Sequence, residues 1–523
     1  MNFNEILKTT NYDVVGTVDI TETIEHQLRD LRKEVFEPNE RIFVCYDQDY
    51  FADASTVGRK LRELQKALQH IDITNCFVVV VTAYTDIVDA LKKLSDQPME
   101  YIVSTDKFIK HTPKSIKKKS IGNNVYNSSD LAKISMNELT ERERYLLTES
   151  KTFCMYPWVH LHAYPTGDAQ PCCHAEHMAG NFGDFKKQTM QQVWSSDKMQ
   201  QLRKDMLNGN KHKACTRCYE QEESGFFSGR QSANKHHGHQ IKKGTDINPP
   251  FQLTYWDIRF SNLCNLSCRS CGHIFSSSWY QDQKKLYGAG HNNIDQAMFY
   301  AGQHEMDMYE QLIEHIDYVE QAYFAGGEPL MMKEHYMILD ELEKRQMFDV
   351  RLIYNTNFTK NKLKDKTIFD YWSKFKNVSV GASLDAMGPR AEFIRNGTKW
   401  SDVEYNRQQL LERCPHVDFY ISPTMSIQNA LHIPDFHRDW VERGWLKPGD
   451  LNVNILQDPA WLRIDIATDR YKDMIREKLT AHLDWLRPLD TISRATVGFE
   501  SALNYLDAGN RQDQLPVFWE KMK

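Results

Sequence analysis

The stretch "SNLCNLSCRSCG" (residues 261–272) decides how the rest of the sequence is interpreted. It holds Cys264, Cys268 and Cys271, separated by three residues and then by two. Thiolates suit zinc and iron–sulfur clusters, and a structural zinc site normally has four protein ligands. Three cysteines with no fourth beside them therefore indicate a metal centre with one open position. A cluster of four irons and four sulfides fits this pattern, because one iron stays free to bind a small molecule.

Residues 251–460 alternate strand-like and helical segments, which predicts a parallel sheet with helices outside it. The six expected strands are "QLTYWDIRF", "YVEQAYFAG", "VRLIYNTN", "VSVGASLD", "VDFYISPTM" and "DLNVNILQ". Six strands are too few for a closed eight-stranded barrel, so we expect an α/β fold with a partial (β/α)6 TIM-like barrel. The cysteine loop directly follows the first strand, at the C-terminal mouth where barrel chemistry takes place. Residues 461–523 are expected to form C-terminal helices.

The three-cysteine loop is similar to the signature of radical S-adenosylmethionine (radical SAM) enzymes. A second motif, "AYFAGGEPLMM", supports this resemblance; it places Gly326, Gly327, Glu328 and Pro329 at the end of the second expected strand. In that family the open iron binds the amino and carboxylate groups of S-adenosylmethionine, and a GGEP segment contacts the amino group. The resemblance implies that the reduced cluster generates a 5′-deoxyadenosyl radical, which abstracts a hydrogen atom. One position departs from the family pattern: Ser270 stands where an aromatic residue is usual.

The resemblance also implies cofactor contacts at later strand ends. Asn357, in the segment "NTNF", closes the third strand, where the family often has a polar residue near the ligand. Ser383 and Asp385 follow the fourth strand and resemble the ribose-contacting positions. Arg395 is a candidate partner for the methionyl carboxylate through a bidentate pair, with a helix-surface salt bridge as the alternative.

A second group of cysteines lies upstream, in residues 151–230. The segment 158–172 alternates around a Thr-Gly-Asp turn and predicts a hairpin, and a helix over 189–209 precedes a CxxC motif. The pattern resembles the twitch or SPASM auxiliary-cluster domain of some radical SAM enzymes, although such a domain usually follows the barrel. The resemblance implies an auxiliary four-iron cluster on Cys154, Cys172, Cys215 and Cys218. Cys173 competes with Cys172, and a structural zinc ribbon is the alternative for the whole site.

The remaining segments carry weaker signals. Residues 1–115 predict a small α/β domain of unknown role, with buried strands at 41–46 and 76–84, and no glycine-rich phosphate loop follows a strand. Residues 116–150 and 231–250 are polar and predict linkers. The second linker contains three histidines that we expect to be exposed and flexible: His236, His237 and His239.

Composition narrows the class of protein. The net charge of −6, with both signs mixed along the chain, gives no footprint for nucleic acid. The start lacks a signal-peptide pattern, and the longest apolar run, 76–84, is too short to span a membrane. We therefore expect a soluble cytoplasmic protein. In a reducing compartment, clustered cysteines are metal ligands more often than disulfides.

Together these patterns predict a radical SAM enzyme that oxidatively modifies a peptide or protein. An electron donor such as flavodoxin or ferredoxin would reduce the first cluster, and the auxiliary cluster would accept an electron from the substrate radical. A small-molecule substrate such as a sugar, a nucleoside or another metabolite is the first alternative. A zinc-binding structural or interaction protein is the second. No residue stands out as a catalytic acid or base.

Overall fold

The computed structural model describes residues 13–18, 41–47, 76–82, 99–103, 108–111, 138–176, 179–223, 227–288 and 295–522. The chain divides into two compact units, and the smaller one contains a five-stranded sheet. Its strands, in spatial order, are β1 (Asp13–Val18), β2 (Arg41–Asp47), β3 (Cys76–Thr82), β4 (Met99–Val103) and β5 (Phe108–His111). The first four run parallel and β5 is antiparallel to β4. The strands expected at 41–46 and 76–84 are confirmed.

The larger unit is built on an eight-stranded sheet with the order β17-β15-β12-β11-β9-β6-β7-β8. Its members are β6 (His160–Ala163), β7 (Asp168–Gln170), β8 (Gly183–Asp184), β9 (Tyr255–Ile258), β11 (Gln321–Phe324), β12 (Arg351–Thr356), β15 (Val378–Ala382) and β17 (Asp418–Ile421). All neighbours from β17 to β6 pair in parallel, and the hairpin strands β7 and β8 pair antiparallel. The upstream cysteine segment and the expected barrel strands thus share one continuous sheet.

The expected parallel sheet is confirmed, but the sixth expected strand lies outside it. That segment forms β19 (Asn454–Ile455), which pairs in parallel with β18 (Thr424–Met425) in a separate two-stranded sheet. One isolated bridge, between Ile421 and Leu451, connects this segment to the end of β17. Pro423 lies between the end of β17 and the start of β18, where it cannot donate to a ladder because proline has no N–H.

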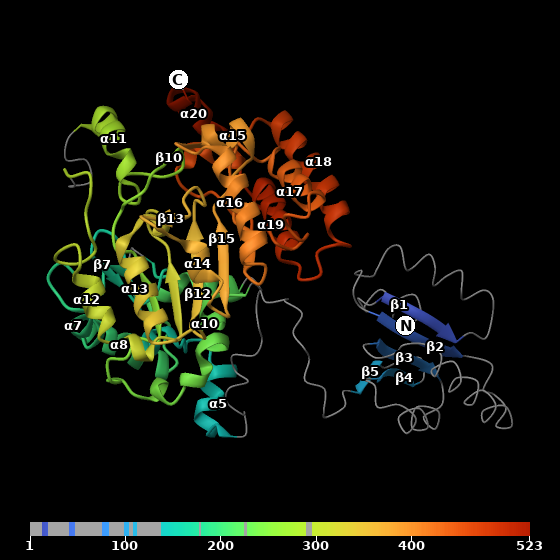
Figure 1. The fold of residues 1–523 in the computed structure, drawn as a ribbon, viewed down its shortest axis with the longest axis horizontal. Coiled ribbons are helices and arrows are strands. Elements are labelled where there is room, and N and C mark those ends of the chain that lie inside the picture. Colours follow the sequence, from blue (N-terminus) through green and yellow to red (C-terminus); the bar gives the residue numbers. More distant parts are fainter. Residues whose placement is uncertain are drawn as a thin grey trace. The chain divides into compact units, whose positions relative to one another are not determined.

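Helices follow the strands as the alternating pattern predicts (Figure 1). Helices between the parallel strands include α12 (Asp307–Ile313), α13 (Lys333–Lys344), α14 (Ile368–Trp372) and α16 (Trp400–Arg413), and α17 (Ile433–Glu442) follows β18. The expected C-terminal helices are present as α18 (Asp469–Leu486), α19 (Arg494–Ala508) and α20 (Leu515–Met522). Among the described helices, none is long and apolar enough to be a candidate membrane span.

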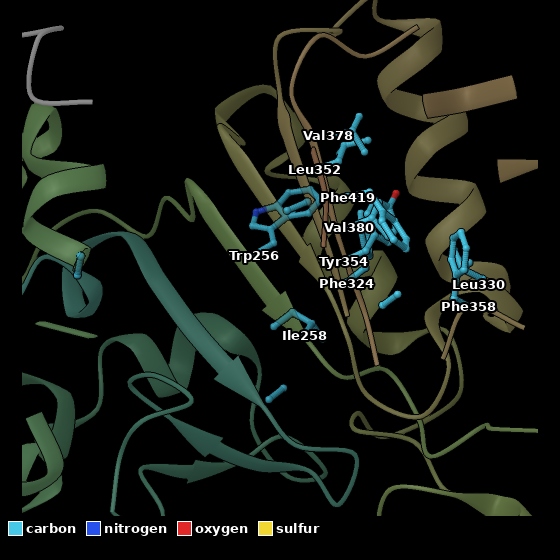
Figure 2. Close-up of a cluster of buried hydrophobic side chains, with 14 of the residues drawn as sticks. Trp256, Ile258, Phe324, Leu330, Leu352, Tyr354, Phe358, Val378, Val380 and Phe419 are labelled. Atoms are coloured by element: carbon cyan, nitrogen blue, oxygen red, sulfur yellow. The ribbon is translucent and has the colours of Figure 1, made fainter. Parts of the chain in front are cut away.

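Alternation along the parallel strands gives the main sheet an apolar face and a polar face. Figure 2 shows the apolar side chains, which include Trp256, Phe324, Leu352, Val380 and Phe419, packed as one buried cluster. The residues between them on the same strands must point to the opposite face. That second face carries hydrogen-bonding groups, listed here from β9 to β17: Tyr255, Asp257, Tyr323, Asn355 and Tyr420.

The prediction of a linker at 231–250 is wrong. Helix α10 (Gly229–His237) and two short 3-10 turns occupy it, and His237 is buried. The polar side chains that suggested solvent exposure bind backbone instead. Asn234 accepts a hydrogen bond from Met155 N at 2.9 Å and donates one to Phe153 O at 3.1 Å.

Two further expectations about flexible segments are also corrected. His239 is not free, because its Nε2 lies 2.5 Å from a carboxylate oxygen of Glu320. The end of the expected linker 116–150 forms helix α5 (Glu141–Thr148), whose first turn is closed by a capping box between Thr140 and Glu143. Residues 116–137 of that linker lie outside the described residues, as does the segment 55–69, whose apolar periodicity predicts a helix.

Leu352→Ala tests the apolar face. Leu352 is fully buried, so we expect the free energy of unfolding of the larger unit to fall by about 2 to 5 kcal/mol. Leu286→Ala is the control, because this leucine of α11 (Tyr280–Tyr287) is 60% exposed and should change stability by less than about 0.5 kcal/mol. Urea titration followed by tryptophan fluorescence measures both. Equal losses would contradict the packing described.

Candidate iron–sulfur sites

The three-cysteine loop leaves the main sheet where β9 ends. A short antiparallel pairing fixes its centre: β10 (Ser267–Cys268) lies against β16 (Arg395–Asn396), so Cys268 is opposite Arg395. Further along, Ser276 Oγ donates to Leu266 O at 2.6 Å and Trp279 Nε1 donates to Cys268 O at 2.9 Å. The loop is therefore held at its backbone by strand β16 and by two side chains that follow the loop in sequence.

The three thiols lie close enough to influence one another. Burial, together with the neighbouring thiolates of Cys268 and Cys264, raises the pKa of Cys271 to about 12. Burial likewise raises the pKa of Cys264 to about 11. Without a metal these thiols keep their protons at neutral pH, and a bound metal would replace them.

The glycine motif packs directly onto this loop. Gly326 has φ +121, a conformation that favours glycine, and a Cβ on Gly327 would lie 2.1 Å from Leu263 O. The backbone N of Glu328 donates to the same Leu263 carbonyl at 2.7 Å. The chain that enters Cys264 can approach the end of β11 only because position 327 has no side chain.

The Glu328 carboxylate is fully buried and bonded within the protein. It accepts hydrogen bonds from Thr356 Oγ1 at 2.7 Å, Asn357 N at 2.7 Å and Leu330 N at 3.1 Å. Burial outweighs these donors and raises its pKa to about 7. The carboxylate thus ties β11 to the end of β12, and its predicted contact with an amino group of the cofactor stays a prediction.

The other predicted cofactor residues gather around the same loop. Asn357 Nδ2 lies 3.9 Å from Cys264 Sγ and donates to Asn265 Oδ1 at 3.0 Å. Ser383 follows β15, with its backbone N bonded to Thr356 O at 2.8 Å. Pro329 begins a buried 3-10 turn directly after Glu328. The structure therefore brings these sequence positions to one edge of the sheet.

Arg395 contacts both a buried carboxylate and a cysteine thiol, so it does more than form a salt bridge on a helix surface. Its Nε donates to Asp385 Oδ2 at 2.8 Å, and one terminal nitrogen lies 3.7 Å from Cys268 Sγ. Burial alone would lower the pKa of Arg395, but Asp385 and the thiols raise it above its ordinary value. Asp385 also accepts a hydrogen bond from Thr424 N at 2.7 Å, so both of its oxygens are engaged. A positive charge therefore lies beside one thiol of the three-cysteine loop.

The upstream cysteines form a second site. Cys154, Cys172, Cys215 and Cys218 line one cavity together with His174 and Arg230. Cys154 precedes α6 (Tyr156–Val159) and Cys172 follows β7. Cys215 and Cys218 belong to the turn and helix α9 (Thr216–Glu223). Three segments that are separate in the sequence thus converge on one set of thiols.

Cys172 and Cys173 point to different surroundings. Cys172 lines the cavity and its pKa is raised by burial and by the thiolates of Cys173 and Cys154. Cys173 is not among the described residues that line it. Burial raises the pKa of Cys173 to about 12, with Asp257 raising it and Arg259 lowering it, so this thiol lies toward the polar face of the main sheet.

Arg230 was not predicted as part of the site, because it lies next to the segment interpreted as a linker. One of its terminal nitrogens donates to Ser150 O and Phe153 O at 2.9 Å, and its Nε donates to Glu222 at 2.8 Å. It thereby fixes the backbone just before Cys154. Only its charge and its position near a CxxC motif could have suggested this role.

Gly327→Ala tests the close approach of the glycine motif to the loop. The added methyl group would collide with the Leu263 carbonyl, so we expect about four fewer irons per chain after anaerobic reconstitution. Gly272→Ala is a matched control beside Cys271, since a Cβ there meets no atom within 4 Å. Iron and acid-labile sulfide assays give the counts, and normal loading of the Gly327 variant would refute the steric argument.

Cys172→Ala and Cys173→Ala separate the two adjacent cysteines. We expect the first to lose the upstream cluster, about four irons per chain, because its thiol lines the cavity. The second should keep that cluster, because its thiol faces the sheet. The same iron and sulfide assays apply. The reverse pattern would exchange the two assignments.

Comparison with known proteins identifies the upstream domain. Residues 154–219 match the family described as the SPASM iron–sulfur cluster-binding domain. No curated protein matches the chain. Residues 154–219 therefore contain an iron–sulfur cluster-binding domain of the SPASM type, as predicted.

Solved structures resemble parts of the chain. "Native anSMEcpe with bound AdoMet and Cp18Cys peptide" is 17% identical over 43% of this chain and 57% of that one, with a TM-score of 0.30. Streptococcus suis SuiB bound to S-adenosylmethionine is 16% identical over 53% and 61%, with a TM-score of 0.31. TYW1 with a lysine–pyruvate adduct is 14% identical over 44% and 71%, with a TM-score of 0.24. The chain spans less than two thirds of the first two structures, and the family identification is that of its SPASM iron–sulfur domain.

Proposed function

We propose that the chain is a radical SAM enzyme that oxidises a peptide or protein substrate. The observation that carries this proposal is the packing of the glycine motif onto the three-cysteine loop, through the contact between Gly327 and Leu263. Three thiols, a half-buried arginine and two glycines meet at the C-terminal edge of a parallel sheet. This edge is where open α/β sheets bind their ligands.

The donor set fits a four-iron cluster with one open iron. Cys264, Cys268 and Cys271 would hold it, and no fourth cysteine side chain belongs to this loop. When bound, such a cluster reductively cleaves S-adenosylmethionine and supplies a 5′-deoxyadenosyl radical. An external electron-transfer protein such as flavodoxin or ferredoxin would provide the electron.

The chain's own groups would bind and orient the cofactor. Backbone groups of Gly326 and Gly327 are available for close approach to the amino group, since no side chain shields them. Arg395 would balance the charge of the thiolates and of a ligand carboxylate, while Asp385 holds its guanidinium in place. Asn357, beside Cys264, would add a hydrogen-bond donor.

The polar face of the main sheet is the proposed substrate surface. Asn355 Nδ2 donates to the Tyr323 hydroxyl at 2.6 Å, and the Arg259 guanidinium lies 5.7 Å from the centre of the Tyr323 ring. Gly381 makes room here, because a Cβ would lie 2.9 Å from Tyr420. A surface of amide, phenol and guanidinium groups favours a substrate rich in hydrogen-bonding groups, such as a peptide backbone.

The SPASM cavity supports net oxidation. A cluster held by four cysteines has no open iron, so electron transfer is its simplest role. The hairpin of the SPASM domain and the strand that leads into the three-cysteine loop belong to one sheet. This arrangement would let the auxiliary cluster accept the electron that a substrate radical releases.

Cys264→Ala tests the proposed chemistry. We expect it to abolish 5′-deoxyadenosine formation from S-adenosylmethionine and dithionite, because one of three cluster ligands is lost. Cys414→Ala is the control, since this cysteine is buried against Phe369 O, at 3.5 Å, away from both sites, and should leave the activity intact. Chromatography of 5′-deoxyadenosine measures the result under anaerobic conditions.

Two outcomes would contradict the proposal. Undiminished cleavage by the Cys264 variant would remove the three-cysteine loop from the chemistry. Stoichiometric zinc without iron in the anaerobically purified chain would make it a zinc-binding protein.

A further inference from the structure

A cluster of two histidines and an aspartate lies where the SPASM domain joins the main sheet. In the parallel pairing of β6 with β9, His160 is opposite Tyr255 and His162 is opposite Asp257. Residues two apart on a strand project to the same face, so the two imidazoles and the carboxylate gather on one side. One ligand atom from each of the three lies within 4.8 Å of the others, and all three residues are buried.

The hydrogen bonds of this cluster indicate which of its atoms could hold an ion, and they leave one buried nitrogen without a partner among the described residues. His160 Nδ1 lies 3.2 Å from Tyr255 O, so it must donate its proton to that carbonyl, and its other nitrogen carries a lone pair. His162 Nδ1 lies 2.9 Å from Asp257 Oδ2. Its Nε2 is buried and has no hydrogen-bond partner among the described residues. Nδ1 and Nε2 lie on opposite sides of the imidazole ring, so an ion that also binds Asp257 would take the place of the proton between His162 Nδ1 and Asp257 Oδ2.

The enclosure of the cluster restricts what can bind there. His162 and Asp257 have no exposed surface and His160 has 1%, which leaves no opening for a substrate. A metal ion is small enough to lie among three buried side chains. It can also be taken up while the chain folds, before the cluster is enclosed. Two imidazoles and one carboxylate are also a donor set that divalent transition metals take.

We propose that His160, His162 and Asp257 bind one divalent transition-metal ion, Zn²⁺ or Fe²⁺, at a third metal site separate from both cysteine sites. The surrounding contacts resemble those that orient metal ligands. The Tyr255 carbonyl fixes the tautomer of His160, and Arg259 Nε lies 3.4 Å from Asp257 Oδ1.

The ion would join two parts of the chain that carry different cysteine sites. His160 and His162 lie on β6, between Cys154 and Cys172, and Asp257 lies on β9, which leads into Cys264. Bonds from one ion to both strands would fix the SPASM hairpin to the main sheet. The role is positional, and the inference stands whether or not the chain cleaves S-adenosylmethionine.

Metal analysis of the full chain tests the inference directly. A four-iron cluster contains one sulfide for each iron. The amount of metal per chain that exceeds the amount of sulfide therefore measures the occupancy of the new site. We expect the reconstituted chain, after removal of loosely bound metal with a chelator, to retain about one zinc or iron per chain beyond its sulfide. X-ray absorption at the edge of that metal, or of Co²⁺ supplied in its place, should show nitrogen and oxygen neighbours without sulfur.

His160→Asn and His162→Asn should weaken Co²⁺ binding by more than roughly 100-fold, the upper end of what loss of a supporting contact costs. His237→Asn is the matched control. This histidine is also buried with an unpaired nitrogen, and its ring stacks on Tyr255 at 5.3 Å, but it is outside the cluster. Unchanged sulfide content and circular dichroism show that each variant is folded.

Three results would overturn the inference: no metal beyond sulfide in the unaltered chain, sulfur in the first shell of the extra metal, or full retention of that metal by both folded variants. The first two need no variant. If the cluster is only a hydrogen-bonded pair of side chains, the first result is expected. Absence of 5′-deoxyadenosine together with a retained extra metal would reject the proposed function and leave this site standing.

Discussion

The parallel pairing of β6 with β9 is the constraint on which the rest of the larger unit depends. Without β6, the first strand of the parallel sheet would be an edge, with a row of unpaired N–H and C=O groups, and parallel sheets normally keep their strands buried. The pairing spans His160 to Ala163 against Tyr255 to Ile258. It covers that edge with the SPASM hairpin, so the two cysteine sites share one sheet.

The same pairing explains why the sheet has two different faces. The apolar face in Figure 2 packs through Trp256, Leu352 and Phe419, and its burial provides most of the driving force for folding. The opposite face is then filled by polar groups, which must bond to one another or to ligands. Arg259 with Asp257, and Asn355 with Tyr323, are such pairs.

Local patterns predicted much of this arrangement. The spacing of Cys264, Cys268 and Cys271 and the glycine motif identified the loop, because both depend on residues close in sequence. Strands β11, β12, β15 and β17 followed from runs of apolar residues between turns. The break between α7 (Met190–Trp194) and α8 (Asp197–Leu207) was missed, since Ser196 caps a new helix within one helical pattern.

Contacts between distant segments could not be predicted in this way. The joining of β6 to β9 depends on a register between residues 95 positions apart, as in the contact of His162 with Asp257. The polar stretch after Arg230 suggested a solvated linker, but Asn234 binds the backbone at Phe153 and Met155. Composition shows that a side chain can form hydrogen bonds, and only the fold decides whether its partner is water or backbone.

Both cysteine sites solve one electrostatic problem in the same way. Thiolates are costly to bury, and burial raises the pKa of Cys154 and Cys271 well above the ordinary range. Each site places an arginine nearby: the buried Arg230 in the upstream cavity and the half-buried Arg395 at the loop.

A carboxylate holds each of these arginines in place: Glu222 bonds Arg230 and Asp385 bonds Arg395. The positive charge lowers the pKa of the neighbouring thiols, and the paired carboxylate keeps the guanidinium from turning toward solvent. Thiols next to a fixed cation give up their protons to an incoming metal at a lower free-energy cost than thiols in an apolar pocket. In the proposed function, the two arginines would therefore prepare both sites for metal before any metal is bound.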